Sequence, residues 1–397
     1  MKHGLFFRFY RMFHNESLCC FLARAFYLLF LLKFFLKKLV RKKHNVNMTT
    51  QEAHNIIDNI YPRPECKPVY ENPKINTDID LSVVIPVYNY VDIIAQNVEA
   101  ILNQNTKYNY EVILVDDGST DGALEVIKGY ENDPKVKIIC QKNAGIGAAR
   151  NTGINTASGK YLMFIDCDDI VHNDIVEVLM NKAYSESYDM VICAHNLVKE
   201  KNGEVYEVVP NVYPICNLVG YKNGDEIMNY PGLPWCKVYK RELFNNVRFF
   251  PGYWYEDTII QFLIFPQCKS FSYLQKVEYE YKWYEKNFSH TQDNAKNIKS
   301  IDRYWLLREI LEQYEKTGLK KDEVFYTLLL RHISVYYYLN ISQLEPQAVE
   351  ALYVLAKELY DMYKPTEKVK LPYFLRQVEK AFDNDDFELW KLASRLN

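Results

Sequence analysis

The stretch that most constrains this chain is a short apolar run followed at once by three carboxylates. Residues 161–165 are nearly all apolar, which is typical of a strand buried on both faces of a parallel sheet, and Asp166, Asp168 and Asp169 follow. Burying such a cluster without a partner costs several kcal/mol per charge. The cluster is therefore expected at a sheet edge, facing a divalent cation with a phosphate-rich ligand. The alternative is an acidic turn that caps a helix starting near Asn173.

This run belongs to an alternation of strands and helices that begins at residue 81. Strands are predicted at 81–87, 111–115, 136–140 and 161–165, and helices at 92–104, 123–130 and 146–156. Units of this length imply an α/β fold with a doubly wound, mostly parallel sheet and right-handed crossovers. The loops that follow the strands then meet at one edge of the sheet.

The pattern beyond this alternation is less regular until the chain becomes helical. Further strands are expected at 188–194, 205–210 and 276–284, short helices at 241–245 and 256–265, and later helices at 297–316, 322–341, 345–363 and 371–394. We therefore divide the chain into residues 1–46, a linker at 47–80 with a short helix at 50–60, an α/β domain at 81–290 and a helical C-terminal region at 291–397.

The N-terminal segment is basic and apolar. Residues 1–43 hold ten Lys and Arg against one acid, Glu16, so the rest of the chain carries a net charge of −12. Its longest uninterrupted apolar run, 25–32, has eight residues, whereas a membrane span needs about twenty. A helix with Phe and Leu on one side and Lys and Arg on the other suits a membrane surface.

Several alternatives to membrane association remain open for residues 1–46. The helix could dock on the body of the protein, span the membrane, or belong to an extension before a start at Met48. Nucleic-acid binding is not expected, because Phe and Leu outweigh the exposed cations. Basic residues after the apolar part favour a cytoplasmic protein, peripheral on the cytoplasmic face of the membrane. The nine scattered cysteines, an odd number without a CxxC pair, indicate a reducing compartment.

Four segments in order carry a family resemblance. VVIPVYN at 83–89, VDDGSTDG at 115–122, NAGIGAARNTGI at 143–154 and SGKYLMFIDCDD at 158–169 together resemble the glycosyltransferase family 2 enzymes. The resemblance covers about residues 81–290. It implies the Rossmann-like GT-A fold, an inverting sugar transfer and a nucleotide-sugar donor, most often a UDP-sugar.

The resemblance also implies a nucleotide site. Pro86 and Tyr88 would lie at the end of the first strand, with Tyr88 stacked on the uracil ring, and Asp117, with Asp116, would accept from the base N–H. Packing in the core is the alternative for Tyr88, and turn formation is the alternative for the two aspartates. Arg150 would face the diphosphate or the base, or else form a salt bridge to one of the acidic loops.

A metal site follows from the same resemblance. Asp166 and Asp168 correspond to the DxD motif of the family, in which Asp166 would also approach the ribose and Asp168 would ligate Mn²⁺ or Mg²⁺ directly. Asp169 would cap the turn or support its neighbours. The bound cation would neutralise charge on the departing UDP.

The expected base lies further along the chain. Glu256 and Asp257 match the ED motif of the family, where Asp257 would take the proton from the acceptor hydroxyl and Glu256 would orient or bind the acceptor. An acidic helix start is the alternative. Trp235 and Lys237 would line the acceptor or diphosphate side. The segment at 281–284 resembles one usually written with Arg, and here Lys282 stands in its place.

The sequence therefore predicts an inverting, metal-dependent transferase. It would move a hexose or hexose derivative from a UDP-sugar to a glycan hydroxyl, in synthesis of cell-surface polysaccharide or of a lipid-linked glycan. A GDP- or dTDP-sugar donor is one alternative. A catalytically silent protein that binds nucleotide sugars is another, and the presence of all three of Asp166, Asp168 and Asp257 speaks against it.

Overall fold

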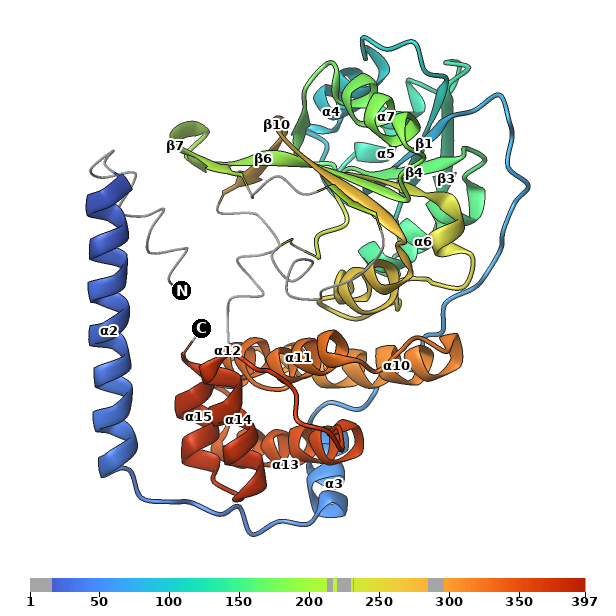
Figure 1. Ribbon diagram of the computed structural model, residues 1–397. Helices are drawn as coiled ribbons and strands as arrows, with labels where there is room; N and C mark the ends of the chain where they lie inside the picture. The colour runs from blue at the N-terminus through green and yellow to red at the C-terminus, as the bar shows by residue number, and fades with distance from the viewer. Residues whose placement is uncertain (1–15, 213–216, 220–229, 231, 285–295, 397) are drawn as a thin grey trace. The chain divides into compact units, whose positions relative to one another are not determined.

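The computed structural model describes residues 16–212, 217–219, 230, 232–284 and 296–396 (Figure 1). Two compact units can be distinguished. One comprises residues 64–291 and 305–320, and the other comprises residues 1–63, 292–304 and 321–397.

The first unit is built on one mixed sheet. Strands β1 (Leu81–Val87), β2 (Tyr110–Asp116), β3 (Val136–Cys140) and β4 (Tyr161–Phe164) pair in parallel in the order β3-β2-β1-β4. This half is the predicted parallel sheet. The helices between its strands are α4 (Ile94–Leu102), α5 (Ala123–Lys128) and α6 (Ile146–Thr156), and α7 (Ile175–Ser185) follows the last strand.

Both faces of β1 are covered, as its unbroken run of buried residues requires. On one face Val83 and Ile85 join a core with buried residues of α4, α5 and α7. On the other face α6 comes so close that a Cβ on Gly153 would lie 2.2 Å from a methyl carbon of Val84. A glycine is needed at this crossing, and its close approach fixes α6, which carries Arg150, against the sheet.

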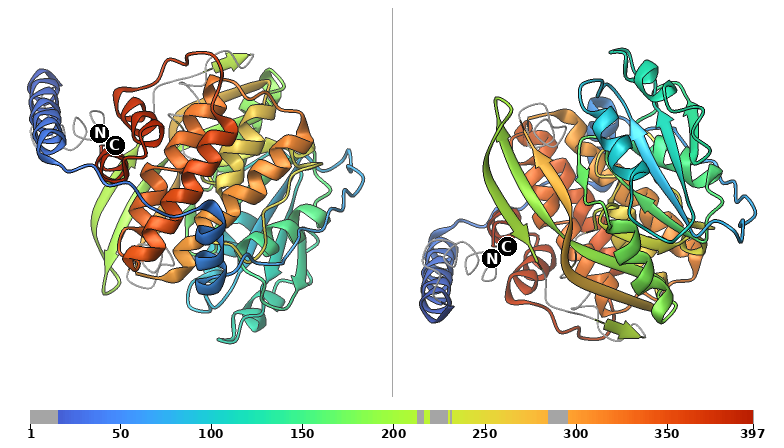
Figure 2. Two further views of the ribbon diagram at one scale, coloured as in Figure 1. Left: turned by 90° about the horizontal axis from the view of Figure 1, so that it is seen from below. Right: turned by 90° about the horizontal axis from the view of Figure 1, so that it is seen from above.

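The second half of the sheet is mixed rather than parallel. Strand β9 (Lys237–Lys240) is antiparallel both to β4 and to β6 (Met190–Lys201), and β10 (Ser270–Trp283) runs parallel to β6. Three short or peripheral strands pair antiparallel: β5 (Ile170–Val171) and β8 (Asn217–Val219) with β10, and β7 (Glu204–Asn211) with β6. The ribbon of β6 and β7 is drawn in green in both views of Figure 2.

The helix predicted at 256–265 begins later and is irregular. The segment contains a π-helical turn at Ile260–Ile264 and a 3-10 turn at Phe265–Gln267. A second short 3-10 helix lies at Arg241–Phe244. Such π turns are frequent at functional sites, and this one begins three residues after Asp257.

The remaining helices are α2 (Glu16–Val40), α3 (Thr50–Ile60), a 3-10 turn at Ile298–Ile301 and α10 (Asp302–Thr317), followed by α11 (Glu323–His332), α12 (Val335–Ile341), α13 (Pro346–Tyr363), α14 (Tyr373–Asp383) and α15 (Phe387–Ser394). Helix α3 starts with a capping box in which Thr49 and Glu52 bond reciprocally. Among the described residues, none of the helices combines the length and apolarity needed to cross a bilayer.

Candidate active site

The loops after the parallel strands meet at one edge of the sheet, as predicted. The backbone N–H of Asp117 donates to the carbonyl of Val87 at 2.8 Å, which joins the ends of β1 and β2. The Asn89 amide oxygen accepts from the backbone N–H of Thr120 at 2.7 Å. The residues after β1 and β2 therefore form one rim.

The two aspartates after β2 both support this rim. Asp116 accepts from the backbone N–H groups of Gly118 and Ser119 at 3.2 and 3.3 Å, which closes a tight turn. Asp117 accepts from the backbone N–H groups of Ala144 and Gly145, both at 2.9 Å, and from the side chain of Gln141 at 2.7 Å. Burial raises the pKa of Asp117 despite these bonds. The predicted contact of either aspartate with a nucleotide base stays a prediction.

Pro86 and Tyr88 differ in their surroundings. Pro86 is buried inside β1, opposite Val115 in the register. Tyr88 lies just past the strand and is 45% exposed, so its ring is not a packed core tyrosine. An exposed aromatic ring on this rim is available for stacking, whereas Pro86 shapes the strand end from within.

The acidic turn after β4 is held from two directions. The Asn97 side chain of α4 donates to the carbonyls of Asp166 and Asp169 at 3.2 and 2.8 Å. From β10, the Tyr279 hydroxyl donates to the carboxylate of Asp169 at 2.6 Å, and the backbone N–H of Lys282 donates to the same carboxylate at 2.9 Å. Asp169 thus supports the turn, and Lys282 contributes through its backbone.

Asp168 has a different environment from Asp169. Its carboxylate accepts from the Tyr284 hydroxyl at 3.1 Å. Burial, and after it the charge of Asp166, raises the pKa of Asp168 to about 6. A carboxylate whose pKa is raised by burial and by a neighbouring negative charge would be stabilised in its ionised form by a bound cation.

The donor set at this turn fits a hard divalent cation that shares its ligands with a substrate. Within the part of the chain that the structure describes, no three or more His, Cys, Asp or Glu side chains converge as a complete metal cage. Mg²⁺ and similar ions are often held by one or two carboxylates together with substrate phosphates. Asp166 and Asp168 supply carboxylates of this kind.

Arg150 connects the two acidic segments. Its guanidinium is 2% exposed and lies over the ring of Phe249. One terminal nitrogen is 2.7 Å from a carboxylate oxygen of Asp166, and the other is 2.5 Å from a carboxylate oxygen of Glu256. Burial disfavours this charge, but the two carboxylates outweigh it and raise the pKa of Arg150. The salt-bridge alternative for Arg150 is therefore the arrangement observed.

Glu256 and Asp257 follow a strained residue. Tyr255 has a φ of +64°, which a tyrosine rarely adopts, and this conformation directs the chain into the acidic pair. Burial raises the pKa of Glu256 to about 7 against the attraction of Arg150, and Asp257 adds to the rise. Asp257 is half-buried and close enough to act electrostatically on both Glu256 and Lys237.

Lys237 is buried, and its ammonium does not point outward. It donates to the backbone carbonyls of Leu233 and Trp235 at 2.7 and 3.2 Å. Burial lowers its pKa to about 8, and Cys236, Cys193 and, least of the three, the charge of Asp257 partly oppose this effect. Lys237 thus provides a positive charge near Asp257, while its predicted contact with substrate stays a prediction.

Trp235 sits in an aromatic stack that sequence reasoning missed. Its ring stacks against Tyr279 with centroids 4.9 Å apart and against Tyr281 at 5.1 Å, and the edge of His195 meets it at 4.8 Å. Tyr279 therefore serves both this stack and Asp169. The signal in the sequence was the alternation of tyrosines along β10, but 33 tyrosines in the chain made these ones hard to single out.

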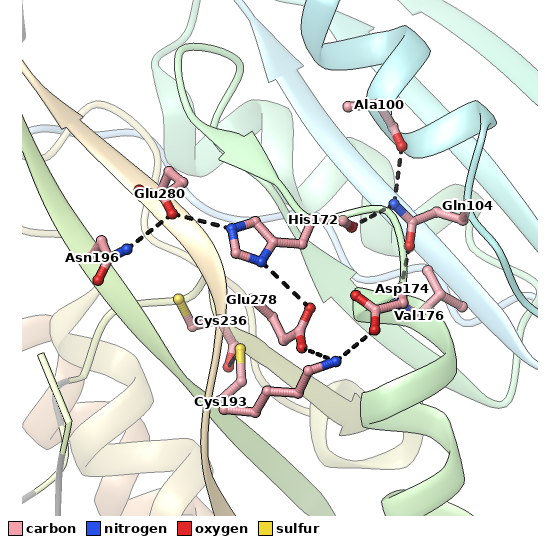
Figure 3. Close-up of polar contacts among 11 residues, drawn as sticks. Ala100, Gln104, His172, Asp174, Val176, Cys193, Asn196, Cys236, Glu278 and Glu280 are labelled. Atoms are coloured by element: carbon pink, nitrogen blue, oxygen red, sulfur yellow. Dashed lines mark hydrogen bonds and ion pairs between the residues drawn. The ribbon is translucent and has the colours of Figure 1, made fainter. Parts of the chain in front are cut away.

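A polar network beyond the acidic turn fixes the position of β10 (Figure 3). His172 bonds through its ring to Glu280 at 3.1 Å, and its backbone N–H donates to the carbonyl of Glu278 at 3.0 Å. The carbonyl of His172 accepts from Gln104, which is also bonded to Ala100 of α4. Further contacts in the network involve Asn196 with Glu280, Lys276 with Asp174 and Glu278, and Cys193 with Cys236.

Backbone strain gathers at the same segments. Six described non-glycine residues have a left-handed φ, and three of them, Asn89, Cys236 and Tyr255, adjoin Tyr88, Lys237 and Glu256 respectively. Each such residue costs of the order of 1–3 kcal/mol and persists only where the surrounding structure imposes it. Strain of this kind is concentrated at functional sites, and here it marks the predicted ones.

Comparison with known proteins agrees with this geometry. Residues 82–248 match the family described as Glycosyl transferase family 2. The chain is 30% identical over 261 residues to the uncharacterized glycosyltransferase YibD of Escherichia coli, covering 63% of this chain and 75% of YibD. It is also 30% identical over 264 residues to the cholesterol galactosyltransferase of Borreliella burgdorferi, covering 62% and 69% of the two chains.

A solved structure shows the same fold. The S. aureus TarS fragment 1–349, crystallised in complex with UDP-GlcNAc, superposes with a TM-score of 0.60 at 19% identity, covering 80% of this chain and 90% of that one. The fold is thus GT-A, with a helical C-terminal region. From the matched family, the two relatives and the converging acidic segments, we conclude that this chain belongs to glycosyltransferase family 2 and is a glycosyltransferase that uses a nucleotide sugar.

Proposed function

We propose that this chain is an inverting, metal-dependent transferase that moves a hexose or hexose derivative from a UDP-sugar to a hydroxyl of a glycan. The observation that carries the proposal is the shared guanidinium of Arg150, which bonds to Asp166 and to Glu256. A donor held at the first carboxylate and an acceptor held at the second would then face each other within one site.

The donor is assigned to the rim formed after β1 and β2. Tyr88 is the exposed aromatic ring there, and a base stacked on it would lie above the turn that Asp116 and Asp117 stabilise. The TarS fragment, which shares the fold, was crystallised with UDP-GlcNAc, and this supports a UDP-sugar over a GDP- or dTDP-sugar in this chain. GDP- and dTDP-sugars differ from a UDP-sugar in the base, so comparing the three donors tests whether this rim binds the base.

Asp166 and Asp168 would hold Mn²⁺ or Mg²⁺ together with oxygens of the donor diphosphate. When bound, the cation supplies positive charge that stabilises the departing diphosphate. Asp169 takes no part in this binding, because Tyr279 and the Lys282 backbone already occupy its carboxylate. The turn is thereby fixed before the donor arrives.

Asp257 would act as the base. The acceptor hydroxyl gives its proton to the Asp257 carboxylate while its oxygen bonds to the anomeric carbon of the sugar. The bond between that carbon and the diphosphate oxygen breaks, and the electron pair leaves with UDP. Attack from the face opposite the leaving group inverts the anomeric centre. Glu256, fixed by Arg150, would orient the acceptor.

The acceptor is proposed to be a growing cell-surface polysaccharide or a lipid-linked glycan. One relative is named for galactosyl transfer to cholesterol, so a lipid acceptor belongs in the same test. The acceptor side lies beside β9 and the aromatic stack of Trp235, Tyr279 and Tyr281.

The experiment is a panel of UDP-, GDP- and dTDP-sugars assayed for nucleotide release with a mixture of glycan acceptors, with and without EDTA. We expect release from one UDP-sugar, loss of activity with EDTA, and recovery with Mn²⁺ or Mg²⁺. NMR of the product should show the anomeric configuration opposite to that of the donor. A retained configuration would contradict single displacement, and full activity in EDTA would contradict the metal site.

A further inference from the structure

Helix α2 is attached to the C-terminal helices by one face only. Phe34 is 2% exposed, and its ring meets the edge of Tyr373 with centroids 6.1 Å apart. One helical turn later, the Lys38 ammonium donates to the side chain of Gln377 at 2.6 Å. Arg41 then forms an ion pair with Asp386. These contacts, all within one compact unit, define which side of α2 faces the protein.

The opposite side of α2 is apolar and exposed. Seven large apolar side chains there have exposures between 45% and 81%. With 3.6 residues per turn, they fall within an arc of roughly 140° centred opposite Phe34. We call this surface the outer face of α2; it consists of Leu28, Leu29, Leu32, Leu36, Leu39 and Val40, with Phe35 at its edge, where the Phe35 ring also lies 5.9 Å from that of Tyr373.

This arrangement inverts the usual placement of an amphipathic helix. A helix on a globular protein normally turns its apolar stripe toward the core. Here the side toward the protein makes polar and ionic contacts through Lys38 and Arg41, and the apolar stripe faces outward. Contiguous exposed apolar surface of this kind marks an interaction site.

The charges beside the outer face identify the partner. Lys33 and Lys37 are exposed along one margin of it, and Lys42 and Lys43 are exposed just after the helix ends. The first 43 residues carry nine more positive than negative charges. A second copy packed on this face would bring like charges together, whereas a lipid surface with anionic headgroups would attract them.

We propose that the outer face of α2 docks on an anionic lipid surface, with its leucines in the acyl region and its lysines at the headgroups. The anchoring contacts through Phe34, Lys38 and Arg41 then tie the C-terminal helices to the same surface. The inference does not depend on the proposed reaction, because vesicle binding is measured without donor or acceptor.

The test uses the full chain and two kinds of vesicle, phosphatidylcholine alone and phosphatidylcholine mixed with phosphatidylglycerol, in a flotation assay. We expect binding to the mixed vesicles, weakened by high salt. Leu32→Ser, Leu36→Ser and Leu39→Ser together should reduce binding on the order of 100-fold, because each removes an apolar side chain from the acyl region. Lys33→Glu with Lys37→Glu should reduce it about tenfold and remove the preference for anionic lipid.

A matched control changes exposed apolar residues elsewhere. Val205→Ser with Val208→Ser alters two side chains of β7 that are 54% and 50% exposed, and it should bind vesicles as the wild type does. All variants change exposed positions, and circular dichroism and thermal unfolding confirm that they fold. Transfer to a water-soluble acceptor should be unchanged in the triple Leu variant.

Three results would overturn the inference. The first is a full chain that stays unbound with anionic vesicles present. The second is equal vesicle binding by the wild type and the triple Leu variant. The third is a dimer, detected by light scattering, that the triple variant converts to a monomer while vesicle binding is absent, since this would assign the outer face to a second copy of the chain.

Discussion

The two acidic segments of the site share one plan and differ in their surroundings. In each pair the first carboxylate, Asp166 or Glu256, is bonded to Arg150. The second carboxylate meets a different neighbour in each case. Asp168 lies beside the charge of Asp166 and the hydroxyl of Tyr284, whereas the charge of Asp257 lies near the buried ammonium of Lys237.

This difference suggests a division of work within each pair. The first carboxylate is paired with Arg150, which holds its segment in place. Near Asp168 the protein adds negative charge, which favours a cation from outside. Near Asp257 the ammonium of Lys237 adds positive charge beside the negative charge of Glu256, and this opposes the repulsion between the two carboxylates. We therefore expect the second members to carry the reaction and the first members to position it.

The largest effect should come from Asp257→Asn, which keeps the shape and removes the proton acceptor. General-base help is worth about 10²–10⁴-fold, so kcat should fall by that amount while donor affinity, measured by calorimetry, stays nearly unchanged. Glu256→Gln should lower kcat less. The exposed Glu242 offers a control, since Glu242→Gln should leave kcat as in the wild type. Equal losses of kcat in the Glu256 and Asp257 variants would contradict the proposed division of roles between these two residues.

Asp168→Asn should act at the donor instead. Losing one carboxylate from the proposed cation site should lower kcat/KM on the order of 100-fold and weaken metal-dependent donor binding in calorimetry. Asp174→Asn is the matched control, because Asp174 lies close in the sequence and is ion-paired to Lys276 outside the acidic turn. Metal-dependent donor affinity equal to that of the wild type in Asp168→Asn would assign the cation to other ligands.

Arg150→Lys tests the link between the pairs. A lysine keeps the charge but cannot bond two carboxylates as a planar fork, and breaking a buried ion pair typically costs about 3–5 kcal/mol when one partner is removed. We expect a smaller loss of stability than this in urea unfolding, together with a loss of both donor affinity and kcat.

The control for Arg150→Lys is Arg248→Lys. Arg248 is equally buried, but it bonds to backbone carbonyls, including those of Val247 and Glu71, and to the side chain of Asn155. Arg248→Lys should lower stability without changing the donor affinity of the folded enzyme. If both variants lost activity in proportion to stability, Arg150 would be only a structural residue.

The sequence predicted the parallel half of the sheet closely. Strands β1 and β3 and helix α6 have the predicted bounds, as does α3 outside the sheet, because apolar runs and helical spacing are local signals. The mixed half was harder. Strand β9 has four residues between two antiparallel partners, and its place is fixed by pairing with strands far away in the sequence, which no local pattern reports.

The residues of the site were likewise predictable only in part. The acidic residues stood out because a cluster of charges directly after a buried strand is costly without a partner, and because Glu256 and Asp257 match a motif of the family. The sequence alone did not show which side chains bond to those acidic residues. Arg150 had several acidic loops within reach, and Tyr279 and Tyr284 were two among 33 tyrosines. Their contacts with Asp169 and Asp168 depend on how β10 pairs with β5 and β6.

The smallest expected effect concerns the positive charge near Asp257. Burial lowers the pKa of Lys237 to about 8 from its ordinary 10.5. Between these values the unfolded chain holds a proton that the folded chain lacks, so this group makes the protein more stable as pH rises through the window. Below pH 8 the buried ammonium is charged in the folded chain as well, so the full destabilisation from burying that charge is present. Lys237→Met should remove this rise, which thermal unfolding across pH 7–10.5 would measure, while any lost hydrogen bonds give an offset independent of pH.

The same measurement tests the proximity of Lys237 to Asp257. Because the charge of Asp257 partly restores the pKa of Lys237, Asp257→Asn should lower that pKa further. The pH window in which stability rises would then begin at a lower pH than in the wild type. Cys236 and Cys193 also lie near the ammonium and act on its pKa more strongly than Asp257 does, so Cys193→Ser should shift the window at least as far and serves as a positive control. If stability rose over the same pH range in Asp257→Asn as in the wild type, Lys237 and Asp257 would not interact. The proposed electrostatic difference between Asp257 and Asp168 would then be wrong.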